Sequence, residues 1–196
     1  ISEAAGRVRL QNVPATAGQA SVAVPALREG ESLIAAYLGG QSGPNPFLEV
    51  PIRDNAAQLP AAAGAPTPVI FAIASHTGMM VKRPAVGGEG YVIDHYSPAV
   101  VSKFIKEVAE PALKALGANV PFSVFCDSFE VAGEDWTPDF LGEFQKRRGY
   151  DLRPWLPALA NDVGAKTQDI RYDWGRTITE ICNDHFLTPM QKWAKS

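Results

Sequence analysis

The sequence changes its character near residue 83, and this change limits the folds that are open to the chain. Up to Arg83, short apolar runs alternate with glycine, proline and asparagine, which is typical of β strands joined by turns. After Arg83, segments with helical spacing of apolar residues flank one compact apolar run at residues 121–125. The sequence therefore predicts a β-rich insertion or accessory module over residues 1–83. Residues 84–196 are expected to form an α/β region.

The first segment is expected to form a small antiparallel β module. Its apolar runs have the length of strands, and clusters of glycine, proline and asparagine separate them. Strands are predicted over residues 22–24, 32–38, 47–52 and 68–75. Residues 58–66 are rich in alanine, proline and glycine, so they are expected to form a loop.

Helices are expected in the second segment. Ser97 followed by Pro98 is typical of a helix start, because serine caps the first turn and proline fits its first position. This helix should end at Gly117 and bend at Pro111, which lacks a backbone N–H. Further helices are predicted over residues 137–149 and 169–194, with a kink at Pro189 in the last and a short helical turn at 152–160.

The order helix, strand, helix is expected for part of a parallel α/β domain. A closed (β/α)₈ barrel normally takes about 250 residues, whereas this chain has 196 and only one convincing strand of the parallel kind. We therefore expect an α/β fold that forms part of a TIM-barrel catalytic domain, preceded by the β-rich segment.

Composition excludes several classes of function. The formal net charge of −3 argues against a nucleic-acid partner held by phosphate contacts. No apolar run reaches the roughly 18 residues that a membrane span needs. The Gly-rich run at residues 87–90 lacks the lysine and serine or threonine of a phosphate-binding loop. Cys126 and Cys182 allow one disulfide, but Cys126 is expected as a small apolar residue inside a strand.

Two carboxylates follow the compact apolar run. Asp127 and Glu130 come where the carboxyl end of a parallel strand is expected, and α/β barrels carry their catalytic groups at this end. Desolvation or a neighbouring carboxylate there raises a carboxyl pKa, as a general acid for glycosidic cleavage requires. The alternative is that Asp127 caps the following turn and Glu130 is a solvated loop residue.

Three further residues are candidates for contact with a ligand, each with a structural alternative. Asp94 and His95 directly precede the helix start, and His95 could bind a sugar hydroxyl, a metal or only another part of the protein. Trp136 could stack on a sugar ring or pack as a hydrophobic staple on the helix that follows it. Tryptophans in helical segments are expected in the core, and these are Trp155, Trp174 and Trp193.

Taken together in one order, these motifs resemble the α-L-rhamnosidases of glycoside hydrolase family 106. The residues that carry the resemblance are 82–95, 127–130 (Asp-Ser-Phe-Glu), 135–138 (Asp-Trp-Thr-Pro), 143–151 and 156–159. The resemblance is strong from about residue 80 to residue 196 and looser in the β-rich segment. The predicted site has Glu130 as a catalytic residue, and the substrate-binding residues are Asp127, Trp136, His95 and Asp94.

The resemblance implies a large, secreted or periplasmic enzyme with a (β/α)₈ barrel. Such an enzyme removes terminal α-L-rhamnose from plant polysaccharides or glycosides with inversion and uses a bound calcium ion. Asp127, Glu89 and Asp94 are conceivable calcium contributors, but the sequence assigns no metal ligand. Glu130 matches one of the family's two catalytic glutamates, and the second is expected downstream of Ser196. Residues 1–196 alone are therefore expected to be inactive. The alternatives are a non-catalytic carbohydrate-binding or interaction fragment and another barrel glycosidase.

Overall fold

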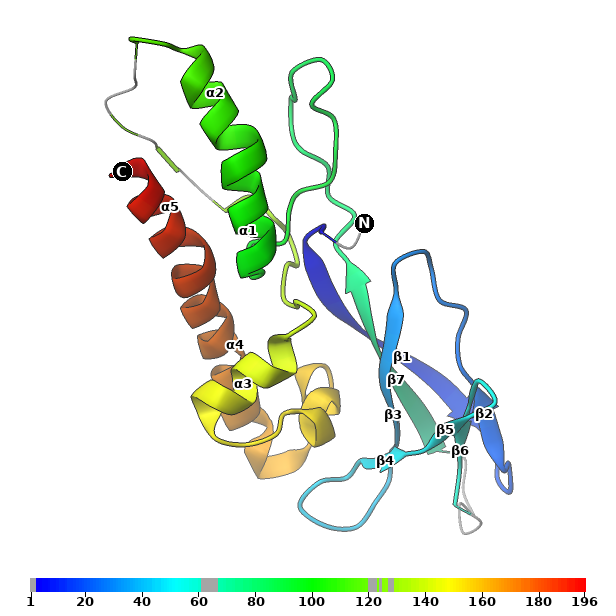
Figure 1. The fold of residues 1–196 in the computed structure, drawn as a ribbon. Helices are drawn as coiled ribbons and strands as arrows, with labels where there is room; N and C mark the ends of the chain where they lie inside the picture. The colour runs from blue at the N-terminus through cyan, green and yellow to red at the C-terminus, as the bar shows by residue number, and fades with distance from the viewer. Residues whose placement is uncertain (1–2, 61–66, 120–122, 124, 127–128) are drawn as a thin grey trace. The chain divides into compact units, whose positions relative to one another are not determined.

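The computed structural model of the protein describes residues 3–60, 67–119, 123, 125–126 and 129–196 (Figure 1). The chain forms two compact units, each assembled from segments that lie far apart in the sequence. The first unit comprises Ile1–Arg7, His76–Asp139 and Ile178–Ser196, and the second comprises Val8–Ser75 and Phe140–Thr177. The predicted domain boundary between residues 83 and 84 stays a prediction.

In the described residues, the strands form two sheets. The four-stranded sheet has the order β1-β7-β3-β4, and the three-stranded sheet has the order β2-β6-β5. β3 is antiparallel to both β7 and β4, and β6 is antiparallel to both β2 and β5. The strands are β1 (Gly6–Ala15), β2 (Ser21–Ala23), β3 (Ser32–Leu38), β4 (Leu48–Val50), β5 (Ile52–Arg53), β6 (Ala56–Gln58) and β7 (Thr67–His76).

The two sheets share one cluster of buried apolar side chains. Val22 of β2 and Ala57 of β6 belong to it, together with Leu38 of β3 and Phe71 of β7. Burying a side chain such as Val, Leu or Phe contributes about 1.5–3 kcal/mol. This shared core therefore holds the strands together as one β module within the second unit.

Three of the four strands predicted in the first segment are confirmed: the range 32–38 coincides with β3, and the ranges 22–24 and 68–75 fall on β2 and β7. The range 47–52 was predicted as one strand, but it is divided at Pro51 into β4 and β5, which belong to different sheets. β1 and β6 were not predicted. Of the predicted loop at residues 58–66, residues 61–66 lie outside the described part of the chain.

The helix predicted after Ser97 is present, and its winding changes in the middle. The Ser97 hydroxyl accepts a backbone hydrogen bond of 3.4 Å that caps α1 (Pro98–Phe104). A π-helical turn, η1 (Ile105–Ala109), then leads into α2 (Glu110–Ala115). Pro111 has no N–H for the usual helical bond, and a π turn accommodates the loss by adding a residue to the turn. The disturbance predicted at Pro111 thus takes the form of a π turn.

The remaining helices follow the prediction with shifted starts. α3 (Phe140–Arg148) begins three residues later than the predicted cap at Thr137. The short turn expected near residue 155 is a 3₁₀ helix, η2 (Arg153–Leu159), and it is followed by another, η3 (Gly164–Lys166). The last predicted helix consists of α4 (Thr167–Cys182), the π turn η4 (Asn183–Leu187) and α5 (Thr188–Ala194), with the π turn again just before a proline, Pro189.

The described residues are a mixture of helices and strands, and they do not include a closed barrel. The strand predicted at residues 121–125 lies mostly outside the described part of the chain. Cys126 was expected inside that strand, and this expectation is wrong, because Cys126 is an exposed free thiol in no strand. None of the helices in the described part combines the length and hydropathy needed to cross a bilayer.

Candidate active site

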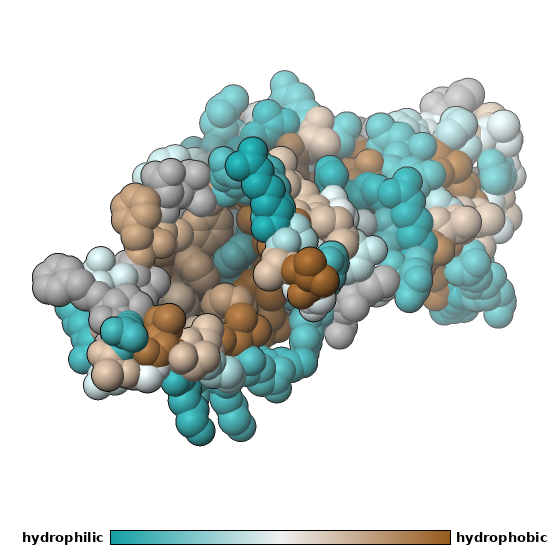
Figure 2. All heavy atoms as spheres, turned by 90° about the horizontal axis from the view of Figure 1, so that it is seen from above, coloured by the Kyte–Doolittle hydropathy of each residue, from teal (hydrophilic) through white to brown (hydrophobic). Residues whose placement is uncertain are grey.

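A hollow in the first unit contains the predicted catalytic residue. Its volume is about 340 Å³, and most of its lining is apolar. The view from above shows apolar side chains gathered in a hollowed face (Figure 2). The lining residues are Met79, Met80, Val81, Lys82, Val92, Ile93, His95, Phe104, Cys126, Phe129, Glu130, Val131 and Phe186. Short backbone pairings, Ala4 with Ile93 and Met80 with Tyr91, hold part of this lining in place.

Glu130 lies in this lining and reaches solvent. Its carboxylate forms an ion pair of 2.7 Å with the ammonium of Lys82, and 62% of its side chain is exposed. The hydrogen bond from Lys82, and then the lysine's charge, hold the pKa of Glu130 below its ordinary value. The pKa was expected to be raised, and that expectation is wrong. Because the side chain is in water, burial does little to disfavour its charged form.

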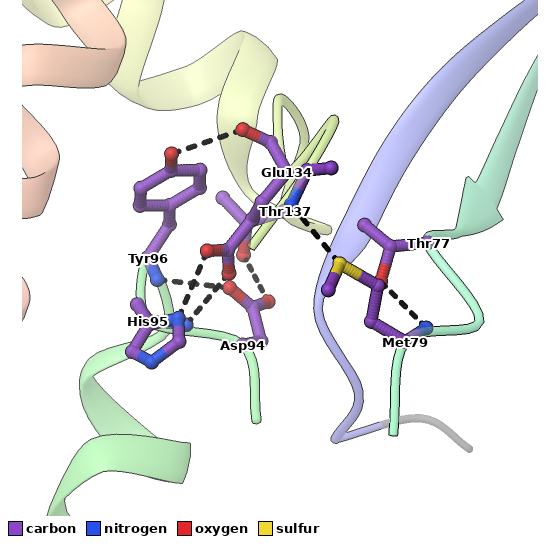
Figure 3. Close-up of polar contacts among 8 residues, drawn as sticks. Thr77, Met79, Asp94, His95, Tyr96, Glu134 and Thr137 are labelled. Atoms are coloured by element: carbon purple, nitrogen blue, oxygen red, sulfur yellow. Dashed lines mark hydrogen bonds and ion pairs between the residues drawn. The ribbon is translucent and has the colours of Figure 1, made fainter. Parts of the chain in front are cut away.

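His95 is held from two sides by a buried glutamate that the sequence did not single out. Glu134 accepts the backbone N–H of His95 at 2.9 Å through Oε1, and its Oε2 lies 2.8 Å from His95 Nδ1 (Figure 3). Only 1% of the Glu134 side chain is exposed. An ionised carboxylate can only accept hydrogen bonds, so Nδ1 carries the proton in this contact. Nε2 of His95 is then the ring nitrogen that can meet a ligand.

Aromatic rings fix the plane of His95. The imidazole meets Phe129 edge-to-face at a centroid distance of 4.7 Å and Phe186 at 4.8 Å. Each such contact contributes about 0.5–1.5 kcal/mol beyond the area that it buries. Phe186 comes from the π turn η4, so this turn brings an aromatic side chain to the hollow.

Asp94 is a buried structural residue next to His95. It is 2% exposed, and its two oxygens accept the Tyr96 backbone N–H at 2.9 Å and the Thr137 hydroxyl at 2.8 Å. Burial raises the pKa of Asp94 despite these two bonds. The hydroxyl of Tyr96 in turn donates to the backbone carbonyl of Glu134 at 3.0 Å. Asp94 therefore joins the segment of His95 to the segment of Glu134.

A family match covers the residues that build this site. Residues 68–196 match the family Glyco_hydro_106, which is described as alpha-L-rhamnosidase. The chain belongs to glycoside hydrolase family 106. The matched range includes Lys82, His95, Glu130 and Glu134, so the contacts described for these two glutamates lie within family 106 sequence.

A curated protein and a solved structure are among the known proteins that resemble this family 106 chain. One is a curated protein of Formosa agariphila named "Putative beta-glucuronidase", 35% identical over 111 residues, which are 54% of this chain and 10% of that protein. The other is the solved structure of a rhamnosidase from Novosphingobium sp. PP1Y. It matches with a TM-score of 0.63 and 24% identity over 78% of this chain and 16% of that chain. This family 106 chain thus spans a small part of the length of both, and the solved structure supports the fold alone.

The other predicted site residues occupy different environments. Trp136 is 4% exposed and pairs through its backbone with Gly6, which supports packing over sugar stacking. Asp127 lies outside the described residues. The structure therefore brings Glu130 and His95 to one hollow, with Asp94 as support. Sequence reasoning missed Lys82 and Glu134, and no spacing signal identifies them, because their partners are 48 and 39 residues away.

The calcium ion expected in family 106 is not supported by the described residues alone. No group of three or more His, Cys, Asp or Glu side chains in that part of the chain is arranged to hold a metal ion. Calcium takes six to eight oxygens, whereas the oxygens of Asp94 already accept two hydrogen bonds and Glu89 is exposed. Calcium therefore stays a prediction from the resemblance.

Proposed function

We propose that this chain is part of the catalytic region of an α-L-rhamnosidase that removes terminal α-L-rhamnose with inversion. One observation carries the proposal: Glu130, within the family match, borders an apolar hollow that also contains the oriented imidazole of His95. Glycosidases of the inverting type need a carboxyl group beside a sugar-sized space. Calcium and a secreted or periplasmic location are part of the same proposal.

The charge of Glu130 favours a role as general base. Lys82 lowers the pKa of Glu130, so the side chain is ionised at neutral pH. An ionised carboxylate can take a proton from the attacking water, whereas a general acid must arrive protonated. The second carboxyl group of an inverting pair stands roughly 6.5–9.5 Å away, and we expect it from outside residues 1–196.

The lining of the hollow fits a deoxy sugar. Rhamnose carries a methyl group where most hexoses carry a hydroxymethyl group, and Phe129, Phe186 and Val131 offer it an apolar surface. Nε2 of His95 could accept a hydrogen bond from one of the ring hydroxyls, because Glu134 holds the proton on Nδ1. Apolar contact and one directed polar contact would then orient the ring above Glu130.

The test uses the full-length protein that carries this sequence and an aryl α-L-rhamnoside. Glu130→Gln removes the charge and keeps the shape, so kcat should fall by roughly 10²-fold or more, the usual loss when acid–base assistance is removed. Glu3→Gln is the matched control, since Glu3 forms a similar exposed ion pair with Lys103 at 2.8 Å. Activity of Glu130→Gln within about threefold of the parent would contradict the role. If Asp127→Asn instead caused the large loss, the role would pass to Asp127.

A β-glucuronidase is the second candidate, because the Formosa agariphila protein named "Putative beta-glucuronidase" is 35% identical over 111 residues of this chain. The ammonium of Lys82 at the hollow could pair with the carboxylate of a glucuronide. Parallel assays with aryl β-D-glucuronide decide between the two sugars. Cleavage of another aryl glycoside alone would favour a different barrel glycosidase, and sugar binding without any cleavage would favour a non-catalytic module.

A further inference from the structure

A second hollow lies within the second unit and has no part in the proposed catalysis. Its volume is about 590 Å³, well within the roughly 300–1,000 Å³ of small-molecule sites. Residues of η2, η3, α4 and the turn before η2 line it. Most of its side chains are aromatic rings (Tyr150, Trp155 and Tyr172) or carboxylates (Asp151, Asp169 and Asp173), and Lys166 and Ile170 complete the lining.

Two aromatic rings of this hollow, those of Tyr172 and Trp155, reach solvent. Tyr172 is 69% exposed although it is a large ring on the helix α4. Trp155 was expected in the core, but it is only half-buried. The exposed Lys166 places its ammonium 5.2 Å from the centre of the Trp155 ring, so a flexible side chain, and not packed hydrocarbon, covers that face. A ligand ring that displaces this side chain gives up an exposed cation–π contact worth only about 0.5–1 kcal/mol.

The polar groups of the hollow suit hydroxyl groups. Asp173 is held in place by the Tyr150 hydroxyl, which donates to Oδ2 at 3.1 Å. Asp169 is exposed, so its carboxylate can accept further hydrogen bonds, and Lys166 can donate them. The three carboxylates do not form a metal site within the described residues. Aromatic faces beside fixed hydrogen-bonding groups match a sugar, whose ring has apolar C–H faces and a rim of hydroxyls.

We propose that this hollow is a second carbohydrate-binding site, which holds a ring of a polymeric substrate by stacking on Trp155 and Tyr172. The identity of the sugar rests on the proposed function, because a rhamnosidase acting on plant polysaccharides meets rhamnose-containing chains. The hydroxyls of the ring donate hydrogen bonds to the carboxylates of Asp169 and Asp173. The site adds affinity for long substrates and leaves the cleavage of a single small glycoside unchanged.

The experiment compares two readouts in the full-length protein. The first is retardation in native gels that contain a plant rhamnogalacturonan, and the second is kcat/KM for an aryl α-L-rhamnoside. Trp155→Ala and Tyr172→Ala should each weaken polymer binding about tenfold, in line with the loss of one aromatic contact, and change the second readout less than about twofold. Tyr172→Phe keeps the ring and should bind as the parent does. Gln168→Ala, also exposed on α4, is the matched control.

Each outcome decides the proposal. The proposal is wrong if the polymer retards both alanine variants as strongly as the parent. It is also wrong if kcat/KM for the aryl rhamnoside falls as much as polymer binding does, which would show a damaged fold or a shared catalytic site. Tyr172→Ala guards against misfolding, because its ring is mostly in solvent. If the parent does not cleave the rhamnoside, but the polymer retards the parent and not the two alanine variants, the proposed function is wrong and the binding site stands. If the rhamnogalacturonan does not retard the parent protein in the gel, the proposed binding site is wrong.

Discussion

Two glutamates of the first unit show how strongly the surroundings of a carboxylate determine its role. Glu130 is mostly in solvent and paired with an exposed lysine, so its pKa is lowered and it stays charged. Glu134 is buried and bonds to both the backbone and the ring of His95. Exposed pairs contribute little to stability, whereas a buried acceptor that loses its donor costs about 1–3 kcal/mol. Glu130 is thus free to act on a substrate, while Glu134 holds another residue.

Glu134→Gln is expected to lower kcat/KM for the aryl rhamnoside by about tenfold or more, the range typical when a partner that orients a site histidine is lost. Glutamine has one acceptor oxygen for two donors, so its amide NH₂ would face either His95 Nδ1 or the His95 backbone N–H, and the ring would lose its tautomer or its fixed position. The pH profile of kcat/KM should change shape as well. Glu3→Gln, an exposed control, should leave both unchanged. If Glu134→Gln has the same kcat/KM and the same pH profile as the parent, His95 needs no positioning partner.

Asp94→Asn is expected to leave stability at pH 7 unchanged or raise it by up to about 1 kcal/mol. The pKa of Asp94 is raised by burial. Its contribution to stability is therefore fully present below the unfolded pKa of about 3.9 and is lost as pH rises through the folded value. Asparagine removes this pH-dependent loss and can keep both hydrogen bonds. The difference between variant and parent should shrink as pH falls toward 4.

Hydrogen exchange of the backbone around Tyr96, at pH 7 and near pH 4, measures this difference in the full-length protein. Thr137→Val is the informative counterpart, since it takes the hydroxyl donor away from the buried carboxylate. It should destabilise the region by about 1–3 kcal/mol. Faster exchange in Asp94→Asn than in the parent at pH 7 would show that the charge itself stabilises the fold.

At the scale of elements, the helices and strands that can be predicted are those whose start, end or apolar pattern is determined by nearby residues. β3 was predicted correctly because a compact apolar run lies between turn residues, and α1 because Ser97 and Pro98 mark its start. β1 does carry a local signal, since polar and apolar residues alternate from Arg7 to Gln11 as in a half-buried strand, but a prediction based on compact apolar runs misses it. The exposure of Glu130, in contrast, has no local signal, because it depends on how distant segments meet.

The π turns make an element-scale prediction. η1 and η4 each end two residues before a proline, but only η4 supplies a described side chain to the hollow, that of Phe186. Its neighbour His185 bonds through Nδ1 to the Tyr96 carbonyl at 2.7 Å and so holds the turn in place. Pro189→Ala restores an N–H and should let the helix continue as an α-helix. Phe186 would then leave its place against His95, and kcat/KM should fall several-fold while exchange near residue 189 slows. Pro111→Ala is the matched control, and it should slow exchange near residue 111 while kcat/KM stays close to that of the parent. If the two variants have the same kcat/KM, η4 has no role in placing Phe186.

At the scale of the whole molecule, both compact units depend on residues from either side of position 83. In the first unit, Ala5 donates to the Val92 carbonyl at 2.8 Å, and Thr77 donates to the Ala5 carbonyl at 2.9 Å. In the second unit, the buried Tyr37 donates its hydroxyl to the Arg153 carbonyl at 2.5 Å. The Arg153 guanidinium in turn donates to the Ile34 carbonyl at 2.7 Å. The β-rich segment is therefore built into both units.

A shortened chain of residues 84–196 should consequently fail to fold cooperatively, even though it contains Glu130 and Glu134. It would lose the strand partners of residues 92–94 and the β module on which η2 is fixed, and each unmade buried hydrogen bond costs about 1–3 kcal/mol. A typical domain has only about 5–15 kcal/mol of stability to lose. Circular dichroism melting and limited proteolysis of the shortened chain, beside residues 1–196, measure this. A sharp melting transition and parental protease resistance in residues 84–196 would show that the α/β region folds without the β-rich segment, as a domain boundary at residue 83 requires.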